Sequence, residues 1–250
     1  MISRCGILRA AACAGLFVGA AASAEAADSN ALPGGTWASI AKLPDFSGVW
    51  EMTFGRGAFP GRQQISLTPK FDAMLKAYQA AAPEDTPASN CVPPGMPGIM
   101  GQPYPIEILY TPGQVTIVIE AYMQVRHIHT DGRKHPDDPD LTFNGHSIGH
   151  WEGDTLVVDS VGFTTDTPLE AMIGARHSDK MHIVERFHLA DPNMLTITTT
   201  VDDSDALASP FARTVSYARH RDWTIAEYIC QQNNRNFVDE KGKAGINLKR

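Results

Sequence analysis

Histidine is absent from the first 126 residues of this sequence, and all nine histidines lie between His127 and His220. Seven of the nine fall between His127 and His182, interspersed with Asp, Arg and Glu. Imidazole titrates closest to physiological pH, so such a cluster is where proton transfer or metal binding is expected. The distribution therefore predicts a functional site in this middle region.

Several motifs that identify a reaction are also missing. The sequence has no phosphate-binding Gly-rich loop followed by Lys-Ser/Thr, no His-Glu-x-x-His and no Cys-x-x-Cys, and we expect no nucleophile elbow of the α/β-hydrolase kind. No fingerprint of an organic cofactor is present, so we predict that none is required. The acidic run from Asp137 to Asp140 lacks the regular ligand spacing of a calcium loop and is interpreted as solvated.

Long apolar runs are scarce as well. Arg4 and Arg9 precede a short Ala-rich run, and Ala22-Ser23-Ala24 fits an A-x-A cleavage site. We predict a signal peptide over residues 1–24, cut after Ala24, and a periplasmic or secreted mature protein. Later segments are too short or too polar for a membrane span of roughly 20 apolar residues.

Positive charge is in deficit. Lys and Arg number 21 against 28 Asp and Glu, giving a formal net charge of −7, and loss of the leader removes two more arginines. Nucleic acid is therefore excluded as an expected partner, and a small molecule is the predicted one. The remaining length suits one domain, which we place at residues 44–250 after a flexible lead-in over residues 25–43. Nothing in the sequence indicates an oligomeric state.

Cysteine is rare, with four in the chain, and Cys5 and Cys13 leave with the leader. Cys91 and Cys230 remain. Two cysteines in an exported chain most simply form one disulfide, which would close a long loop. Two buried free thiols are the alternative.

Helical periodicity is found in one place. Thr68 is suited to an N-cap and Pro69 to the first helical position, and apolar residues then recur at helical spacing. We therefore predict one short helix near residues 69–82. The following segment, from Pro83 to Pro105, is rich in proline and is expected to be irregular.

From Ile106 onward the chain alternates short apolar strands with turn residues, and about ten strands are expected. Many short antiparallel strands indicate a closed barrel or a sandwich. We predict a mainly β protein with a single antiparallel up-and-down barrel of calycin type, whose lumen can hold a small ligand. Gly48-Val49-Trp50 resembles the opening of lipocalin-type barrels, in which the tryptophan plugs the closed end. A core tryptophan beside a turn glycine is the alternative interpretation.

Strand alternation predicts where the first histidines point. If Ile117 to His129 form one unbroken strand, the apolar row from Ile117 to Val125 continues into His127 and His129. That row should face inward, which would place both imidazoles inside the barrel near one mouth. Tyr122 and Arg126 belong to the opposite face, and a bulge before His127 would reverse the assignment.

The candidate site combines these histidines with their polar neighbours. His127 or His129 would be the base, Asp131 would orient it, and a more distant histidine would be the acid. Two inward histidines at i, i+2 can also share a metal ion, leaving a bound water as nucleophile. The full set of candidates is, as catalytic residues, His127, His129, Asp131, His146, His150, His177 and His182; as substrate-binding residues, Tyr122, Arg126, Asn144, Trp151 and Glu185; and, as zinc ligands, His127, His129 and His146.

Four motifs together resemble a large family of exported bacterial proteins of unknown function. They are Leu43 to Trp50, the Pro-Gly-Met loop from Cys91 to Met100, Arg126 to Pro136, and Asn144 to Asp159 with its run Asn-Gly-His-Ser-Ile-Gly-His-Trp-Glu-Gly-Asp-Thr-Leu. The resemblance covers nearly all of the mature chain. It implies export and a single domain, and it transfers no catalytic role.

Our leading hypothesis is a periplasmic enzyme that acts on a small organic substrate in the barrel by histidine acid–base chemistry. Elimination, hydration or isomerisation can proceed with acid and base groups alone, without a nucleophile motif or an organic cofactor. We therefore predict a lyase or isomerase. Zinc-assisted hydrolysis is a variant. The alternative is a non-catalytic lipocalin-like protein that binds a small ligand or a metal, and a structural envelope protein is a third option.

Overall fold

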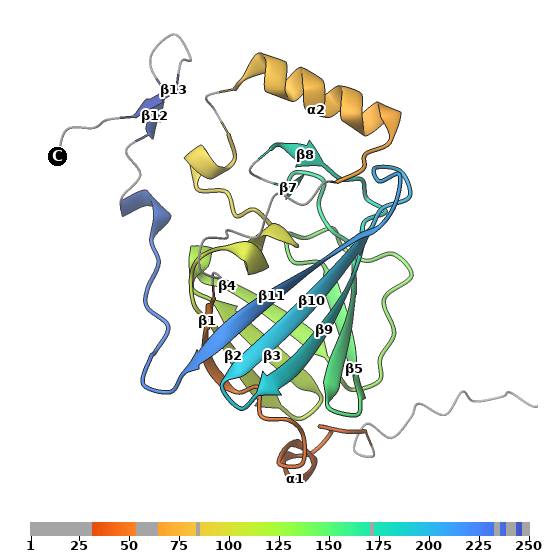
Figure 1. Ribbon diagram of the computed structural model, residues 1–250, viewed down its shortest axis with the longest axis vertical. Helices are drawn as coiled ribbons and strands as arrows, with labels where there is room; N and C mark the ends of the chain where they lie inside the picture. Colours follow the sequence, from red (N-terminus) through yellow and green to blue (C-terminus); the bar gives the residue numbers. More distant parts are fainter. Residues whose placement is uncertain are drawn as a thin grey trace, which may run out of the picture.

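A computed structural model of the protein describes residues 32–53, 65–83, 86–170, 173–232, 236–238 and 244–246 (Figure 1). The predicted signal peptide at residues 1–24 lies outside these ranges. Within the predicted lead-in, the helical turn α1 (Trp37–Ile40) is capped by Thr36, whose Oγ1 accepts a hydrogen bond from the Ser39 backbone N–H at 3.1 Å. Among the helices of the described ranges, none has the length and apolar character needed to cross a membrane.

Nine of the described strands form one closed barrel, in the spatial order β1-β11-β10-β9-β6-β5-β4-β3-β2. This confirms the predicted mainly β barrel. Their bounds are β1 Gly48–Met52, β2 Ile106–Thr111, β3 Gln114–Ile119, β4 Gln124–His129, β5 His146–Glu152, β6 Thr155–Val161, β9 His182–Asp191, β10 Met194–Asp202 and β11 Phe211–His220.

An odd number of strands cannot alternate in direction all the way around a closed ring. Eight of the neighbouring pairs are antiparallel, and the ninth, β4 with β5, is parallel. The barrel therefore departs from a purely up-and-down arrangement at one place. Because β4 and β5 run in the same direction, the connecting segment, residues 130–145, must return along the barrel before β5 begins.

The second helix, α2 (Pro69–Ala81), begins and ends where the sequence predicts. Thr68 occupies the N-cap position, but its hydroxyl donates to the Asp205 backbone carbonyl at 2.7 Å instead of capping the helix. The helix lies beyond one end of the barrel and contacts β8 (Ala175–Arg176), which pairs with β7 (Pro168–Glu170) (Figure 1). The remaining short elements are the 3₁₀ turns η2 Ala88–Asn90, η3 Gly98–Gly101, η4 Ala121–Met123 and η5 Cys230–Gln232, and the strand pair β12 Asn236–Val238 with β13 Ala244–Ile246.

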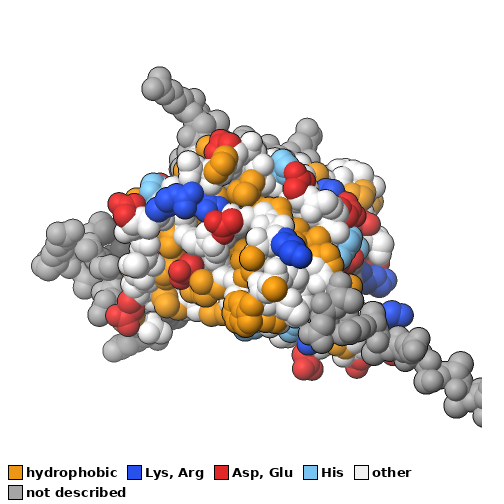
Figure 2. All heavy atoms as spheres, turned by 90° about the horizontal axis from the view of Figure 1, so that it is seen from below, with side chains coloured by type: hydrophobic (Ala, Val, Ile, Leu, Met, Phe, Trp, Pro, Cys, Tyr) orange, Lys and Arg blue, Asp and Glu red, His pale blue; other side chains and the backbone are white. Residues whose placement is uncertain are grey.

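Tryptophan packs inside the end of the barrel at which β1 starts. Trp50 is fully buried, and its indole Nε1–H donates to the Phe46 carbonyl at 2.8 Å. The Arg219 guanidinium from β11 lies 4.4 Å from the Trp50 ring centroid and pairs with Asp45 at 2.9 Å. This is the arrangement that the Gly-x-Trp resemblance predicts. Viewed from below, this end shows apolar side chains scattered among charges of both signs (Figure 2).

The opposite end is covered by the proline-rich segment. Met96, Ile99 and Met100 are buried in the same apolar cluster as the barrel strands. The Tyr217 hydroxyl donates to the Met100 carbonyl, and Arg213 donates to the Pro97 carbonyl, each at 2.7 Å. The segment is tied to the C-terminal region by the Cys91–Cys230 disulfide, which confirms that prediction.

The barrel interior is filled by side chains. Inward-facing residues of the strands, such as Ile108, Ile117, Val158 and Leu195, are fully buried in one continuous cluster. Alternate residues face solvent, as period-two burial in β3 and β10 shows. Among the described residues, the inward-facing side chains of these strands pack as a hydrophobic core, and the predicted ligand cavity in the lumen stays a prediction.

Candidate functional site

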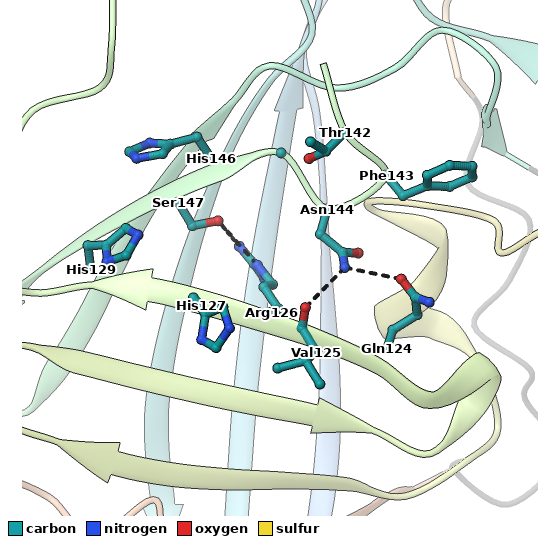
Figure 3. Close-up of a pocket in the computed structure, with 11 residues that line it drawn as sticks. Gln124, Val125, Arg126, His127, His129, Thr142, Phe143, Asn144, His146 and Ser147 are labelled. Atoms are coloured by element: carbon teal, nitrogen blue, oxygen red, sulfur yellow. Dashed lines mark hydrogen bonds between the residues drawn. The ribbon is translucent and has the colours of Figure 1, made fainter. Parts of the chain in front are cut away.

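A cleft of about 420 Å³ opens in the barrel wall between the starts of β4 and β5 (Figure 3). The two strands pair at Ile128↔Ser147 and His129↔Ile148, and their preceding residues diverge. One side of the cleft comes from Gln124 to His129 and the other from the end of the crossover and the start of β5, residues 142–147. The cleft is thus a consequence of the short parallel pairing.

Arg126 connects the cleft to the barrel interior. Its side chain is 1% exposed and pairs with Glu185, which is fully buried, at 2.5 Å between Nη2 and Oε2. The same Nη2 donates to Ser160 Oγ at 3.0 Å and to Ser147 Oγ at 3.2 Å. Among the described residues, Arg126 Nη1 and Glu185 Oε1 have no hydrogen-bond partner. A buried charged network therefore lies directly behind the cleft.

Asn144 bridges the gap between the strands. Its Nδ2 donates to the Val125 carbonyl and to Gln124 Oε1, both at 3.3 Å (Figure 3). Its Oδ1 is buried and finds no partner in the part of the chain that the structure describes. The next residue, Gly145, has a φ of +65°, and a Cβ there would lie 2.6 Å from the Phe163 ring and from the Val161 carbonyl. The chain can make this bend only with glycine.

Histidines line the outer part of the cleft. His127, His129 and His146 are among its lining residues, and the rings of His129 and His146 are 5.4 Å apart. Partial burial lowers the pKa of both His129 and His146, and the Arg133 charge on the crossover lowers each further. Both imidazoles are therefore neutral at pH 7, available as hydrogen-bond acceptors or bases.

A chain of hydrogen bonds runs from the cleft along the outer wall. His146 Nδ1 lies 2.8 Å from His135 Nδ1, and His135 Nε2 lies 3.1 Å from Asp159 Oδ1. His182 Nε2 reaches the same carboxylate oxygen at 2.8 Å. If the neutral His135 donates from Nε2 to Asp159, its Nδ1 accepts from His146 Nδ1–H. That assignment leaves the lone pair of His146 on Nε2.

The predicted facing of His127 and His129 is wrong. Ile119 ends β3, and the 3₁₀ turn η4 intervenes before β4 starts at Gln124. Tyr122 and Met123 in this turn have φ values of +57° and +50°, and Ile119 pairs with Gln124. The intervening turn shifts the alternation by one, so that Arg126 and Ile128 face inward. The two histidines consequently lie on the outside of the wall.

Other predicted residues are separated from the cleft. His150 pairs with Glu152 on the outer surface, and Asp131 forms a salt bridge with Arg133 instead of orienting a histidine. His177 is buried in a different network, 3.2 Å from Thr167 Oγ1 and 2.8 Å from the Ser178 carbonyl. Their predicted catalytic roles remain untested predictions, and they share no site with His146.

The predicted substrate-binding residues fall into two groups. Arg126 and Asn144 line the cleft, and Glu185 lies behind it as the partner of Arg126. Trp151 packs against Phe46 and Tyr110, and Tyr122 packs against Tyr228 of the C-terminal segment. Two of the five predicted binding residues therefore line the cleft, and a third lies behind it.

Zinc was predicted on His127, His129 and His146. Across the described ranges, no group of three or more His, Cys, Asp or Glu side chains has the geometry to hold a metal ion. His127 bonds instead to Gln114 at 3.1 Å, and His146 bonds to His135. The residues present do not fit the predicted metal centre.

Sequence reasoning missed three features of the site. His135 and Asp159 were not among the predicted site residues, because neither the crossover's path nor the parallel pairing is visible in a local pattern. Gly145 to Gly149 also carries the letters Gly-x-Ser-x-Gly. Ser147, however, lies within β5 and not in a strand–turn–helix elbow, and its Oγ contacts Arg126 and Ser160. It is a structural hydroxyl.

No family model and no curated protein matches the chain. Among solved structures, the chain is similar to a secretary abundant heat soluble (SAHS) protein from Ramazzottius varieornatus, with 12% identity over 70% of this chain and 95% of that one and a TM-score of 0.33. It is also similar to the wild-type fluorescent protein UnaG, with 14% identity over 70% of this chain and 97% of that one and a TM-score of 0.32. Likeness at this level transfers no function, and the fold assignment rests on the barrel itself.

Proposed function

We propose that this protein binds a small molecule, and that the binding site is the cleft between β4 and β5. The observation that carries the proposal is the cleft itself, of about 420 Å³, which is lined by three imidazoles and by Asn144. This volume lies within the range of small-molecule sites, roughly 300–1,000 Å³. Imidazole and amide groups can donate or accept hydrogen bonds to a bound molecule.

The composition of the core supports the same proposal. A barrel of this kind is stabilised by apolar packing, and a buried ion pair is often neutral or unfavourable compared with apolar residues of similar volume. Arg126 and Glu185 are 1% and 0% exposed and stand among aliphatic side chains. Their presence is explained if they serve binding and not folding.

Export is part of this proposal. The leader over residues 1–24 and the Cys91–Cys230 disulfide both fit a periplasmic or secreted binding protein, because disulfides persist in oxidising compartments. The membership of the exported bacterial family stays a prediction from the sequence motifs.

The test uses a bulky side chain placed in the cleft. Val125 faces outward, is 45% exposed and lines the cleft, so Val125→Trp should obstruct it without touching the core. Leu109, 41% exposed on β2, gives the matched control Leu109→Trp. A fragment library is screened by NMR with backbone assignments for residues 124–129 and 142–147.

We expect fragments that shift the cleft resonances of the unmodified protein and of Leu109→Trp, with the shifts lost in Val125→Trp. Shifts that map elsewhere, or that survive in Val125→Trp, would show that the cleft is not the site.

A second candidate function is acid–base catalysis at the same cleft, of the lyase or isomerase type. The observation that favours it is the Asp159–His135–His146 chain, in which a carboxylate and one imidazole fix the proton position on another. His146 Nε2 would then be the base for a C–H proton of the bound molecule, and Asp159 and His135 would be positioning residues.

Proton abstraction can be detected before the reaction is known. Cleft-binding fragments with an acidic C–H are incubated in D₂O, and loss of that ¹H signal is followed by NMR. Exchange catalysed by the unmodified protein and abolished in Asp159→Asn, with fragment affinity retained, supports catalysis. Absence of exchange for every bound fragment leaves binding as the function.

A further inference from the structure

We propose that the ligand of the cleft is an uncharged phenol, whose hydroxyl donates a hydrogen bond to His146 Nε2. This inference rests on the proposed function and names the chemical class that the cleft selects. It is carried by the proton position on His146, by the accessibility of the Nε2 atom and by the uncharged character of the described lining.

The proton of His146 is positioned by a carboxylate two hydrogen bonds away. An ionised Asp159 only accepts hydrogen bonds, so the neighbouring His135 Nε2, at 3.1 Å, donates to it. A neutral His135 then has an unprotonated Nδ1, which lies 2.8 Å from His146 Nδ1 and accepts its proton in a hydrogen bond. The neutral His146 ring therefore carries its proton on Nδ1 and a lone pair on Nε2.

The Nε2 atom of His146 is accessible at the cleft. His146 belongs to the lining, and its Nε2 has no hydrogen-bond partner among the described residues, yet it is not one of the polar atoms buried away from solvent. The ring of His129, 5.4 Å away between centroids, also has both nitrogens without a partner in the described chain (Figure 3). A hydroxyl has a donor and lone pairs, so it can donate to His146 and accept from His129.

The lining offers no counter-charge to an ionic ligand. None of the described lining residues is an Asp or Glu, and Arg126 is 1% exposed and neutralised by Glu185. Burial lowers the pKa of both His129 and His146, so both rings are neutral at pH 7. A charged ligand would lose hydration here without gaining an ion pair, whereas an uncharged donor avoids that cost.

An aromatic body suits the rest of the lining. Val125 is 45% exposed and Phe143 is half-buried, and both line the cleft. A flat ring buries a large apolar area against such side chains, and offset or edge contacts with neighbouring rings add to it. A phenolic O–H, with a pKa of about 10, is a stronger donor than an aliphatic alcohol and is still uncharged at neutral pH.

The experiment compares phenols with their methyl ethers, which keep the aromatic ring and lack the O–H donor. Phenol is paired with anisole, and para-cresol with para-methylanisole. The dissociation constants are measured by NMR titration of the amides of residues 124–129 and 142–147. We expect each phenol to bind about fivefold more tightly than its ether, which corresponds to about 1 kcal/mol for one net hydrogen bond. Benzoate and benzylammonium should bind more weakly than phenol.

Two substitutions on β5 test the acceptor. His146→Phe keeps an aromatic ring at the cleft and removes Nε2, so phenols and ethers should bind equally well. His150→Phe makes the same change on the outer face of the same strand, outside the lining, and should preserve the fivefold difference.

The proton position can also be observed directly. In the unmodified protein, long-range ¹H–¹⁵N spectra should show an unprotonated Nε2 on His146, whose signal shifts further with phenol than with anisole. This measurement needs no substitution, so it tests the inference even if His146→Phe fails to fold.

The outcomes separate this inference from the proposed function. Ethers or benzoate that bind the cleft as tightly as the phenols, an unchanged preference in His146→Phe, or a protonated Nε2 on His146 would overturn the inference and leave the cleft as a binding site. If none of these compounds shifts the cleft resonances, and the fragment screen also maps elsewhere, both proposals fall.

Discussion

At the scale of single residues, the Arg126–Glu185 pair is the feature that separates this barrel from a purely apolar one. The two side chains are almost completely buried and share their hydrogen bonds with Ser147 and Ser160. Removing one partner leaves the other charged in a medium that solvates it poorly, which costs about 3–5 kcal/mol.

We therefore predict that Glu185→Gln lowers the free energy of unfolding by about 3–5 kcal/mol. The double variant Arg126→Met/Glu185→Leu should lose far less, or gain stability, because both charges are removed together. Urea unfolding followed by circular dichroism measures both. A double variant as unstable as the single one would mean that the pair stabilises the fold, and the argument for a binding role would lose its basis.

At the scale of elements, the turn η4 decides which side chains face the cleft. Tyr122 and Met123 adopt left-handed backbone conformations, which cost a non-glycine residue about 1 kcal/mol or more. Tyr122 is retained by its packing against Tyr228, whereas Met123 is 45% exposed.

Met123→Gly should therefore be neutral or raise stability by up to about 1 kcal/mol, because glycine adopts positive φ without strain. The matched control is Met74→Gly in α2, 44% exposed and helical, which should lower stability by roughly 1 kcal/mol. Thermal unfolding compares the two. Equal destabilisation by both would contradict the strained turn.

The same turn shows the limit of prediction from sequence. The helix at Pro69, the hairpins and the disulfide follow from local signals such as Pro at the first helical position, turn residues between apolar runs and two remaining cysteines. Glu120 to Met123 contain no Gly, Pro, Asn or Asp, so nothing in this stretch marks a turn. The unbroken strand was the reasonable expectation, and the inversion of His127 and His129 follows from that one omission.

The crossover, residues 130–145, is held to the wall by titratable groups. His135 on the crossover contacts His146 on β5 and Asp159 on β6. His182 on β9 bonds to the same Asp159, and the ring of His129 on β4 lies beside that of His146. Within the crossover, Asp131 pairs with Arg133. Burial disfavours the charged form of His146, so protonation of this ring weakens the attachment of the crossover to β5.

The attachment of the crossover should therefore depend on pH through His146. The pKa of His146 is lowered, first by burial and then by the charges of His135 and Arg133. Folding therefore favours the neutral form of His146. The contribution of this group to the free energy of unfolding is complete above the ordinary imidazole pKa of ~6.5 and is lost as the pH falls below that value. Amide hydrogen exchange of residues 130–145 should accelerate, relative to α2, as the pH falls below about 6.5, after correction for intrinsic rates. His146→Gln should remove this pH dependence, and an unchanged ratio in the unmodified protein would refute it.

At the scale of the whole molecule, one covalent link joins the proline-rich segment over the barrel end to the C-terminal region. Cys91 and Cys230 are 139 residues apart, and a chain-entropy model gives roughly 4–5 kcal/mol for closing so long a loop. The double variant Cys91→Ser/Cys230→Ser should lose most of that stability. Urea unfolding of the oxidised protein and of the variant measures it, and a loss below about 1 kcal/mol would show that the unfolded chain is constrained by other means.

The odd strand count has a further consequence. A ring of eight or ten antiparallel strands can be hydrogen-bonded evenly all the way round, whereas nine strands leave one seam, which here lies between β4 and β5. At this seam the two strands pair at Ile128↔Ser147 and His129↔Ile148, and the cleft opens beside that pairing, with the buried Arg126–Glu185 pair behind it. The position of the cleft in this protein therefore follows from the odd number of strands, and the imidazoles of His129 and His146 line its outer part.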